Sequence, residues 1–307
     1  CHVFYLTRVP SPAIIAQAFK DVKPAIVIAV PLVIEKIIRK KVFPQIQNTK
    51  VKLLMKMPGV GKKVKKRICE QVYQAFGGNL YEVIIGGAAL NQEIESFLKD
   101  IDFPFTVGYG ATECAPIITY SDWHDFVPMS CGREVVHMEV KIDSENPETV
   151  PGEILARGLN VMLGYYKNDE ATAQTIDKDG WYHTGDLGLM DKGGNVFIKG
   201  RSKNMLLGPN GQNIYPEEIE DKLNSMTFAM ESVVVQRDGK LVGLVHPDFD
   251  EVQAMGLSRD DLQSLMEENR VQVNANLPVY CKIAAIEIHD EEFEKTPKKS
   301  IKRYLYK

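Results

Sequence analysis

The stretch from Gly180 to Lys203 constrains this chain more than any other segment. Two strand-like apolar runs flank the pair Gly193-Gly194, which is the pattern of a β-hairpin. Asp186 precedes the first run and Arg201 follows the second, so a hairpin would bring these two side chains close together. A carboxylate accepts hydrogen bonds from vicinal hydroxyls and a guanidinium donates several, so the pair suits a ribose. The alternative is an ordinary ion pair on a surface hairpin.

Length and composition indicate a globular protein of ordinary type. The 307 residues, 44% hydrophobic and 25% charged, allow a large core and predict two domains. The cysteines are scattered without a CxxC pair, which favours reduced thiols over a disulfide framework or a zinc site. The longest uncharged apolar run, Pro24–Ile34, is too short to span a bilayer. We therefore expect a cytoplasmic protein.

The charge is unevenly distributed along the chain. Every charged residue in Lys36–Arg67 is basic, although the net charge is -4. Part of this segment, Pro58–Lys63, looks like a phosphate loop, but Lys56 stands at the first glycine position of that motif and Lys63 at its final Ser/Thr position. A solvated helix face explains the segment. The alternative is peripheral docking on an anionic membrane surface, where each basic residue contributes about 1 kcal/mol. Nucleic acid is not an expected partner.

Strands and helices alternate in the first part of the chain. Buried strands are predicted at Ala25–Val30 and Tyr81–Gly87 and a short strand at Phe103–Val107, with helices between them. This order is typical of βαβ units in a parallel sheet. Ligands bind such sheets beyond the carboxyl ends of the strands. The glycine turns at Gly86-Gly87 and at Gly108–Gly110 are predicted to lie at these ends.

The pattern changes twice in the second part of the chain. Short strands and glycine turns in Gly132–Gly200, including a predicted strand at Val161–Tyr165, indicate a small β-subdomain. A compact α+β unit follows, with a predicted capping box at Ser258. We therefore predict two domains, residues 1–200 and residues 201–307.

Four motifs occur in order along the chain. They are YGATE (Tyr109–Glu113), GWYHTGD (Gly180–Asp186), IKGRSK (Ile198–Lys203) and GQNIYPEEIE (Gly211–Glu220). Together they strongly resemble the adenylate-forming superfamily of acyl-CoA synthetases, luciferases and peptide-synthetase adenylation domains. The similarity is greatest to long-chain fatty acid–CoA ligases, which use ATP, Mg²⁺ and, as a substrate, CoA.

The resemblance implies an α/β fold. Residues 1–200 would be the C-terminal part of a large adenylation domain, with a parallel βαβ sheet and a small β-subdomain. Residues 201–307 would be a small, mobile α+β domain. Cys1-His-Val-Phe4 looks like the family segment that follows a phosphate loop. We therefore expect a fragment without that loop.

The resemblance also implies the residues of a nucleotide site. Glu113 matches the Mg²⁺ ligand, Thr112 the hydroxyl that contacts the α-phosphate, and Tyr109 the ring that packs on adenine. The backbone strip along the other side of adenine matches Gly86, Gly87 and Ala88, where small residues permit close approach. Asp186 and Arg201 match the ribose contacts.

Three further positions belong to the predicted small domain. Lys203 matches a hinge at which the domain rotates between two half-reactions, and Gly211 matches a turn near the pantetheine arm of CoA. Many members have T-P-x-G-K or T-P-x-x-K near the C-terminus, but here Ser300 stands where the phosphate-contacting lysine is expected. We assign that role to Lys299, one residue earlier.

Three classes of function remain open. The leading interpretation is a long-chain fatty acid–CoA ligase. The second is another adenylating enzyme, such as a fatty acyl-AMP ligase or an aryl-acid ligase. The third is a degenerate member that binds nucleotide without catalysis. Ser300 and the expected lack of a phosphate loop support this interpretation.

Overall fold

The chain forms two compact units in a computed structural model, which describes residues 2–6, 12–46, 53–55, 57–208, 211–296 and 300–306. The first unit comprises Cys1–Lys141, Leu155–Thr184 and Met190–Phe197. The second comprises Ile142–Ile154, Gly185–Leu189 and Ile198–Lys307. The long segment of the second unit begins at Ile198, near the predicted domain boundary after residue 200. That boundary itself stays a prediction.

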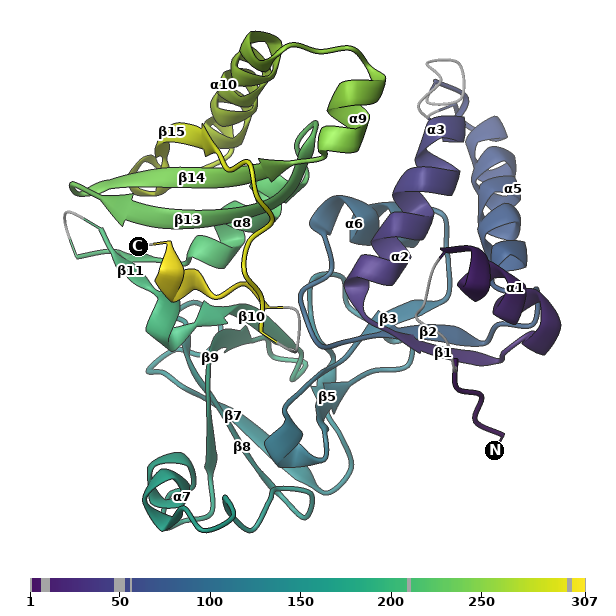
Figure 1. The fold of residues 1–307 in the computed structure, drawn as a ribbon. Coiled ribbons are helices and arrows are strands. Elements are labelled where there is room, and N and C mark those ends of the chain that lie inside the picture. Colours follow the sequence, from purple (N-terminus) through teal and green to yellow (C-terminus); the bar gives the residue numbers. More distant parts are fainter. Residues whose placement is uncertain are drawn as a thin grey trace. The chain divides into compact units, whose positions relative to one another are not determined.

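A parallel sheet with flanking helices forms the first part of the first unit (Figure 1). Its strands, in the order β1-β2-β3, are β1 (Ile26–Ala29), β2 (Glu82–Ile85) and β3 (Phe105–Val107). The helices are α1 (Pro12–Val22), α2 (Pro31–Ile37), α3 (Phe43–Ile46), α5 (Val60–Ala75) and α6 (Gln92–Asp100), with a π-helical turn at Ile38–Val42. Both strand pairs are parallel, as the alternation of strands and helices predicted.

The prediction of a buried strand at Ala25–Val30 is only half right. Val27 is buried, but Ile28 is 80% exposed and Ile26 is 52% exposed. β1 is the edge strand of the sheet, and its alternate side chains point to opposite faces. A continuous apolar run therefore predicted the strand correctly, but it carried no information about which face is covered.

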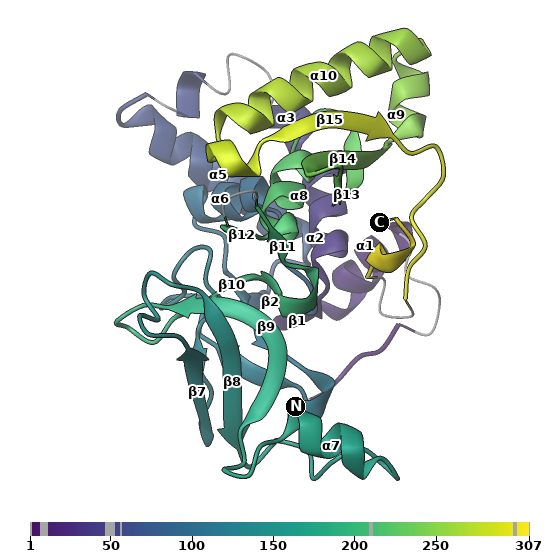
Figure 2. The ribbon, with the colours of Figure 1, turned by 90° about the vertical axis from the view of Figure 1, so that its left-hand side faces the viewer.

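Antiparallel strands follow the parallel sheet. β4 (Tyr109–Gly110), β5 (Ile117–Tyr120) and β6 (Arg133–Glu134) form one sheet. A second sheet, in the order β10-β9-β8-β7, contains β7 (Met138–Asp143), β8 (Gly152–Gly158), β9 (Tyr182–Met190) and β10 (Val196–Arg201). Figure 2 shows β7, β8 and β9 side by side, with the short helix α7 (Asp169–Thr175).

The predicted strand at Val161–Tyr165 is absent from the structure. The Val161 amide donates to the Gly158 carbonyl in a turn, and the Tyr165 amide donates to Thr172 Oγ1 at 2.9 Å. Gly164 has φ +151°, a backbone conformation that favours glycine. Local bonds thus satisfy the amides that a neighbouring strand would have paired.

The C-terminal part of the second unit is a three-stranded sheet with helices. Its strands are β13 (Ala229–Arg237), β14 (Lys240–Pro247) and β15 (Ile283–Ile288), and β11 (Leu206–Leu207) pairs with β12 (Asn213–Ile214). The helices are α8 (Pro216–Asn224), α9 (Phe249–Ala254) and α10 (Arg259–Ala275). The capping box predicted at Ser258 is confirmed, with Asp261 as its partner.

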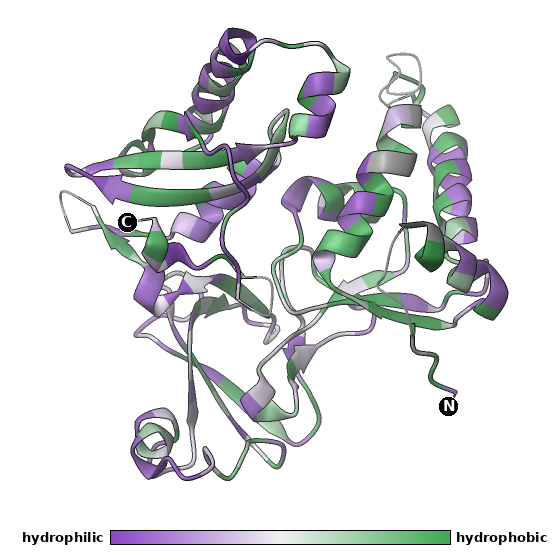
Figure 3. Cartoon of the chain, in the orientation of Figure 1, coloured by the Kyte–Doolittle hydropathy of each residue, from purple (hydrophilic) through white to green (hydrophobic). Residues whose placement is uncertain are grey.

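Both faces of this three-stranded sheet are covered. Val234 belongs to the apolar cluster that contains residues of α8 and α10, whereas its neighbours Val233 and Val235 belong to a cluster with Phe293. Ile301 and Tyr306 of the C-terminal segment pack against this second cluster. Figure 3 accordingly shows β13 and β14 as largely hydrophobic. The C-terminal segment therefore completes the core of the second unit.

Candidate active site

The two predicted glycine turns lie next to each other. Gly86 follows β2 and Gly108 follows β3, and the Gly108 amide donates to the Ile85 carbonyl at 2.9 Å. A Cβ at Gly86 would approach the Gly108 carbonyl oxygen to 3.3 Å, and Gly87 has φ +88°. Gly87 and Ala88 are exposed. This strand edge thus offers open backbone to a flat ligand, although the adenine contact itself stays a prediction.

The YGATE motif forms a tight turn after β3. Tyr109 and Gly110 pair with β5, and Thr112 begins the 3₁₀-helix Thr112–Cys114. A Cβ at Gly110 would lie 2.0 Å from the Pro116 carbonyl oxygen, so only glycine fits there. Tyr109 is buried and Thr112 is exposed. Thr112 therefore lies at the surface of this turn.

The Glu113 carboxylate lies between two tyrosines of the same unit. Tyr165 donates its hydroxyl to Glu113 Oε1 at 2.9 Å. Burial and this hydrogen bond raise the pKa of Tyr165. The pKa of Tyr182 is also raised, first by burial and then by the Glu113 charge, with a hydrogen bond to Glu113 as a further cause. Both phenols thus stay protonated and hold the carboxylate as donors.

Glu113 is a single carboxylate, which suits a Mg²⁺ ion that is also bound by substrate phosphates and water. A metal ion bound by protein side chains alone needs more ligands. Among the residues that the structure describes, no group of three or more His, Cys, Asp or Glu side chains is arranged to hold a metal ion. Mg²⁺ usually keeps several waters and binds one or two carboxylates together with substrate phosphates. Glu113 is only partly buried, and a carboxylate can accept more hydrogen bonds than Tyr165 and Tyr182 donate to it. The residues present therefore fit a Mg²⁺ ion that arrives with a nucleotide.

Asp186 and Arg201 form the ion pair that the hairpin predicted. Arg201 Nε lies 2.7 Å from Asp186 Oδ1, and both residues belong to the second unit. β9 and β10 are neighbours in their sheet, and the turn between them closes with the Gly194 amide on the Asp191 carbonyl. The Asp186 side chain is 11% exposed and that of Arg201 is 52% exposed. Their proximity is confirmed, while the ribose contact stays a prediction.

The predicted hinge residue lies directly after β10, and the predicted turn residue lies between β11 and β12. Lys203 is exposed in the 3₁₀-helix Ser202–Asn204. Gly211 has φ +80°, and its amide donates to the Gly208 carbonyl within the turn between β11 and β12. No atom lies within 4 Å of a Cβ built on Gly211, so the requirement for glycine here is conformational.

The proposed catalytic lysine, Lys299, lies outside the described residues. Ser300 is exposed, and its amide donates to Thr296 Oγ1 at 3.3 Å. Lys302 is engaged in an ion pair with Glu294 at 3.1 Å. The assignment of the phosphate contact to Lys299 remains a prediction.

Two residues of this site were not selected from the sequence. Tyr182 lies within the GWYHTGD motif, on β9, where buried and partly exposed positions alternate. The sequence pattern could therefore have predicted that its side chain is buried. Tyr165 is separated from Glu113 by 52 positions and follows an irregular loop. No local pattern pointed to Tyr165, because only the fold brings the two together.

The first unit thus contains glycine turns at adjacent strand ends and a carboxylate that accepts a hydrogen bond from a tyrosine, and the second unit contains an Asp–Arg pair on a hairpin. The family model for AMP-binding enzymes matches residues 1–166, and this chain belongs to that family.

Two relatives illustrate the range of the similarity. The chain is 37% identical over 178 residues to a long-chain-fatty-acid–CoA ligase of Escherichia coli, covering 56% of this chain and 28% of the relative. It is 38% identical over 177 residues to 4-coumarate–CoA ligase 1 of Glycine max, covering 53% and 60%. The chain thus spans less than two thirds of the length of either relative.

A solved structure shows the same fold. The crystal structure of ATP-bound MatB from Rhodopseudomonas palustris matches with a TM-score of 0.69 and 21% identity, covering 98% of this chain and 53% of that one. The predicted fold class, α/β with part of a large adenylation domain and a small α+β domain, is confirmed.

Proposed function

We propose that this chain belongs to an ATP-dependent acid–thiol ligase that converts a long-chain fatty acid to its CoA thioester. The observation that carries the proposal is the pairing of buried Asp186 with half-exposed Arg201 on the hairpin, at the positions that the resemblance assigns to a ribose. Membership of the AMP-binding family and the similarity to a bacterial long-chain ligase support it.

The proposed reaction has two half-reactions. First, a carboxylate oxygen attacks the α-phosphorus of ATP, the bond to the bridging oxygen breaks, and pyrophosphate leaves with its electrons. Second, the thiol sulfur of CoA attacks the acyl carbon, loses its proton, and AMP leaves. The first step concentrates negative charge around the α-phosphate, so cationic and hydrogen-bonding groups there lower its barrier.

The residues of this chain would bind and orient the nucleotide. Asp186 accepts hydrogen bonds from ribose hydroxyls while Arg201 orients its carboxylate. The backbone at Gly86 and Gly87 approaches the base, and the Thr112 hydroxyl donates to the α-phosphate. Glu113 would hold Mg²⁺, which supplies Lewis-acid neutralisation of phosphate charge when bound.

The proposal is tested by ATP–pyrophosphate exchange with the full-length protein. We expect exchange that depends on palmitate and on Mg²⁺, and formation of palmitoyl-CoA when CoA is added. Exchange without release of a CoA thioester would favour a fatty acyl-AMP ligase. Absence of exchange with every carboxylic acid offered, with AMP still bound, would overturn the ligase proposal and favour a non-catalytic member.

A second substrate class has support from one observation. The similarity to 4-coumarate–CoA ligase 1 covers 60% of that relative at 38% identity. Exchange measured side by side with palmitate and 4-coumarate separates the two classes. A preference for 4-coumarate would replace the fatty acid in the proposal and leave the two-step mechanism unchanged.

A further inference from the structure

The lysine-rich C-terminal segment is built as a short hairpin. Lys295 and Ile301 form an antiparallel bridge, and the Thr296 amide donates to the Ser300 carbonyl at 2.8 Å. One step further out, the Lys302 amide donates to the Glu294 carbonyl at 2.8 Å. Backbone hydrogen bonds thus hold the base of the hairpin together.

A buried ion pair fixes the chain directly after this hairpin. Arg303 donates both terminal nitrogens to Glu220, with Nη1–Oε1 and Nη2–Oε2 distances of 2.6 Å each. Arg303 Nη1 also donates to the Val234 carbonyl at 3.1 Å, and the Val234 amide donates to Glu220 Oε1 at 2.5 Å. The Glu220 side chain is 10% exposed and that of Arg303 is 17% exposed. Burial raises the pKa of Glu220, and Arg303 opposes this rise.

The geometry of this pair specifies direction as well as distance. A bidentate guanidinium–carboxylate contact has two parallel hydrogen bonds and therefore one preferred orientation. Burial of an ion pair is a poor source of net stability, since apolar residues of similar size often serve as well. Apolar contacts already attach the segment, because Ile301 and Tyr306 pack on the core cluster. The pair therefore adds orientation to an attachment that exists without it.

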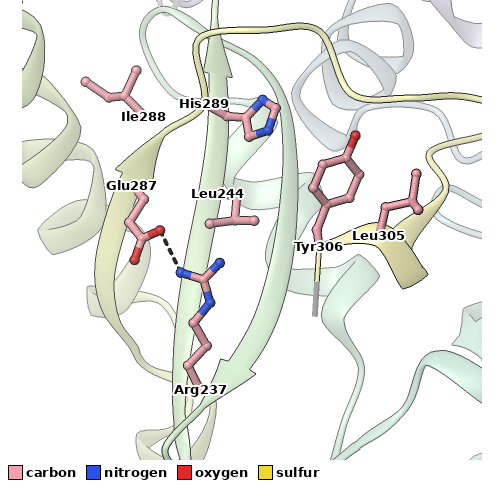
Figure 4. Close-up of a pocket in the computed structure, with 7 residues that line it drawn as sticks. All are labelled: Arg237, Leu244, Glu287, Ile288, His289, Leu305 and Tyr306. Atoms are coloured by element: carbon pink, nitrogen blue, oxygen red, sulfur yellow. Dashed lines mark hydrogen bonds and ion pairs between the residues drawn. The ribbon is translucent and has the colours of Figure 1, made fainter.

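An aromatic contact supports the other side of the hairpin. Tyr306 accepts a hydrogen bond from the Glu294 amide at 2.7 Å, and its ring meets Phe293 edge-on at 5.0 Å. Figure 4 shows Tyr306 beside His289, and the two rings meet edge-on with centroids 5.4 Å apart. Both residues line a small cavity of about 220 Å³, which Arg237 and Glu287 also line. The Arg237–Glu287 pair is exposed, at 2.7 Å, and provides a matched comparison on the same sheet.

We propose that Glu220 and Arg303 are positioning residues, which orient the lysine-rich hairpin for the adenylation half-reaction. The inference rests on the proposed function, in which a lysine of this hairpin contacts the α-phosphate. The carrying observation is the bidentate contact two residues after the hairpin closes. The Glu220 end of the pair lies in the GQNIYPEEIE motif, which the resemblance did not connect with the C-terminal lysine.

The test uses Arg303→Lys in the full-length protein, because lysine keeps the charge and loses the bidentate fork. We expect ATP–pyrophosphate exchange to fall about a hundredfold, the size of effect that a small misplacement of a reacting group produces. Conversion of supplied palmitoyl-adenylate to palmitoyl-CoA should stay within about twofold, because the resemblance assigns the lysine to adenylation alone. Hydrogen exchange of the peptide 294–306 should be faster in the variant.

The control is Arg237→Lys, which alters the exposed pair on the same sheet and should change neither half-reaction. Equal loss of both half-reactions in Arg303→Lys, together with a lowered melting temperature, would show a purely structural pair. Normal exchange in Arg303→Lys with an active parent would also overturn the inference. A parent without exchange would instead contradict the proposed function, and faster hydrogen exchange of the hairpin would still report whether Arg303 orders it.

Discussion

The Asp186 side chain lies on β9, is nearly buried, and forms an ion pair with the exposed guanidinium of Arg201. Replacement by alanine should weaken adenosine-nucleotide binding about ten- to a hundredfold, because a hydrogen bond to a charged group contributes about 1.5–3 kcal/mol. Calorimetric titration with ATP measures this loss in the full-length protein. Glu218→Ala is the control, since it removes the Lys199–Glu218 pair, whose lysine lies on the neighbouring strand β10. Unchanged affinity of Asp186→Ala would exclude Asp186 from the ribose site.

Tyr165 acts on Glu113 through a single hydrogen bond of 2.9 Å. Tyr165→Phe removes only the hydroxyl, so the Glu113 carboxylate should lose its orientation while the packing of the ring is kept. We expect the Mg²⁺ concentration needed for ATP binding to rise about tenfold, at the lower end of the effect of partners that orient metal ligands. Calorimetry at several Mg²⁺ concentrations gives the shift. An unchanged Mg²⁺ dependence would contradict the orienting role of Tyr165 at Glu113.

At the scale of elements, α5 remains the basis for the proposal that this protein docks on membranes. Lys62, Lys63 and Lys66 are exposed on this helix, and the preceding residues Leu53 and Met57 are 65% and 44% exposed. No helix among the described residues is both long and apolar enough to cross a bilayer. Adjacent apolar and basic side chains suit an anionic lipid surface.

The prediction is binding to vesicles of phosphatidylglycerol that declines as salt is added. Changing Lys62, Lys63 and Lys66 to Glu should abolish it, since salt screens the same attraction. Lys65 is left unchanged because it forms an ion pair with Asp100. Cosedimentation compares this variant with one of equal net charge, in which exposed Lys178, Lys192 and Lys240 become Glu. Equal loss in both variants would indicate general charge attraction and contradict a specific surface.

At the scale of the whole molecule, Lys203 is the predicted hinge at which the small domain of the proposed ligase would rotate between the two half-reactions. Lys203→Pro fixes φ near −65° and removes a backbone N–H, so the turn at this position should lose its freedom. We expect ATP–pyrophosphate exchange to persist while thioester formation slows at least tenfold, measured with supplied acyl-adenylate. Lys203→Ala should spare both steps. Equal losses in the proline variant would show that the residue is not a hinge.

Much of this fold follows from local chemistry that a sequence contains. The βαβ order, the Gly193-Gly194 hairpin and the Ser258 capping box depend on neighbours within a few positions. Conformational preferences of glycine and hydrogen bonds of capping residues act at this range, so these elements were predicted correctly. The approach of Asp186 to Arg201 follows for the same reason, because one short hairpin joins them.

Contacts between residues that are distant in the sequence could be identified only from the tertiary structure. The face of β1 that stays exposed, the tyrosine beside Glu113 and the Glu220–Arg303 pair depend on how elements pack. Glu220 and Arg303 are separated by 83 positions, and each alone is an ordinary surface type of residue. Their burial is tolerated only because each satisfies the other, a condition that exists after the C-terminal segment has covered the sheet.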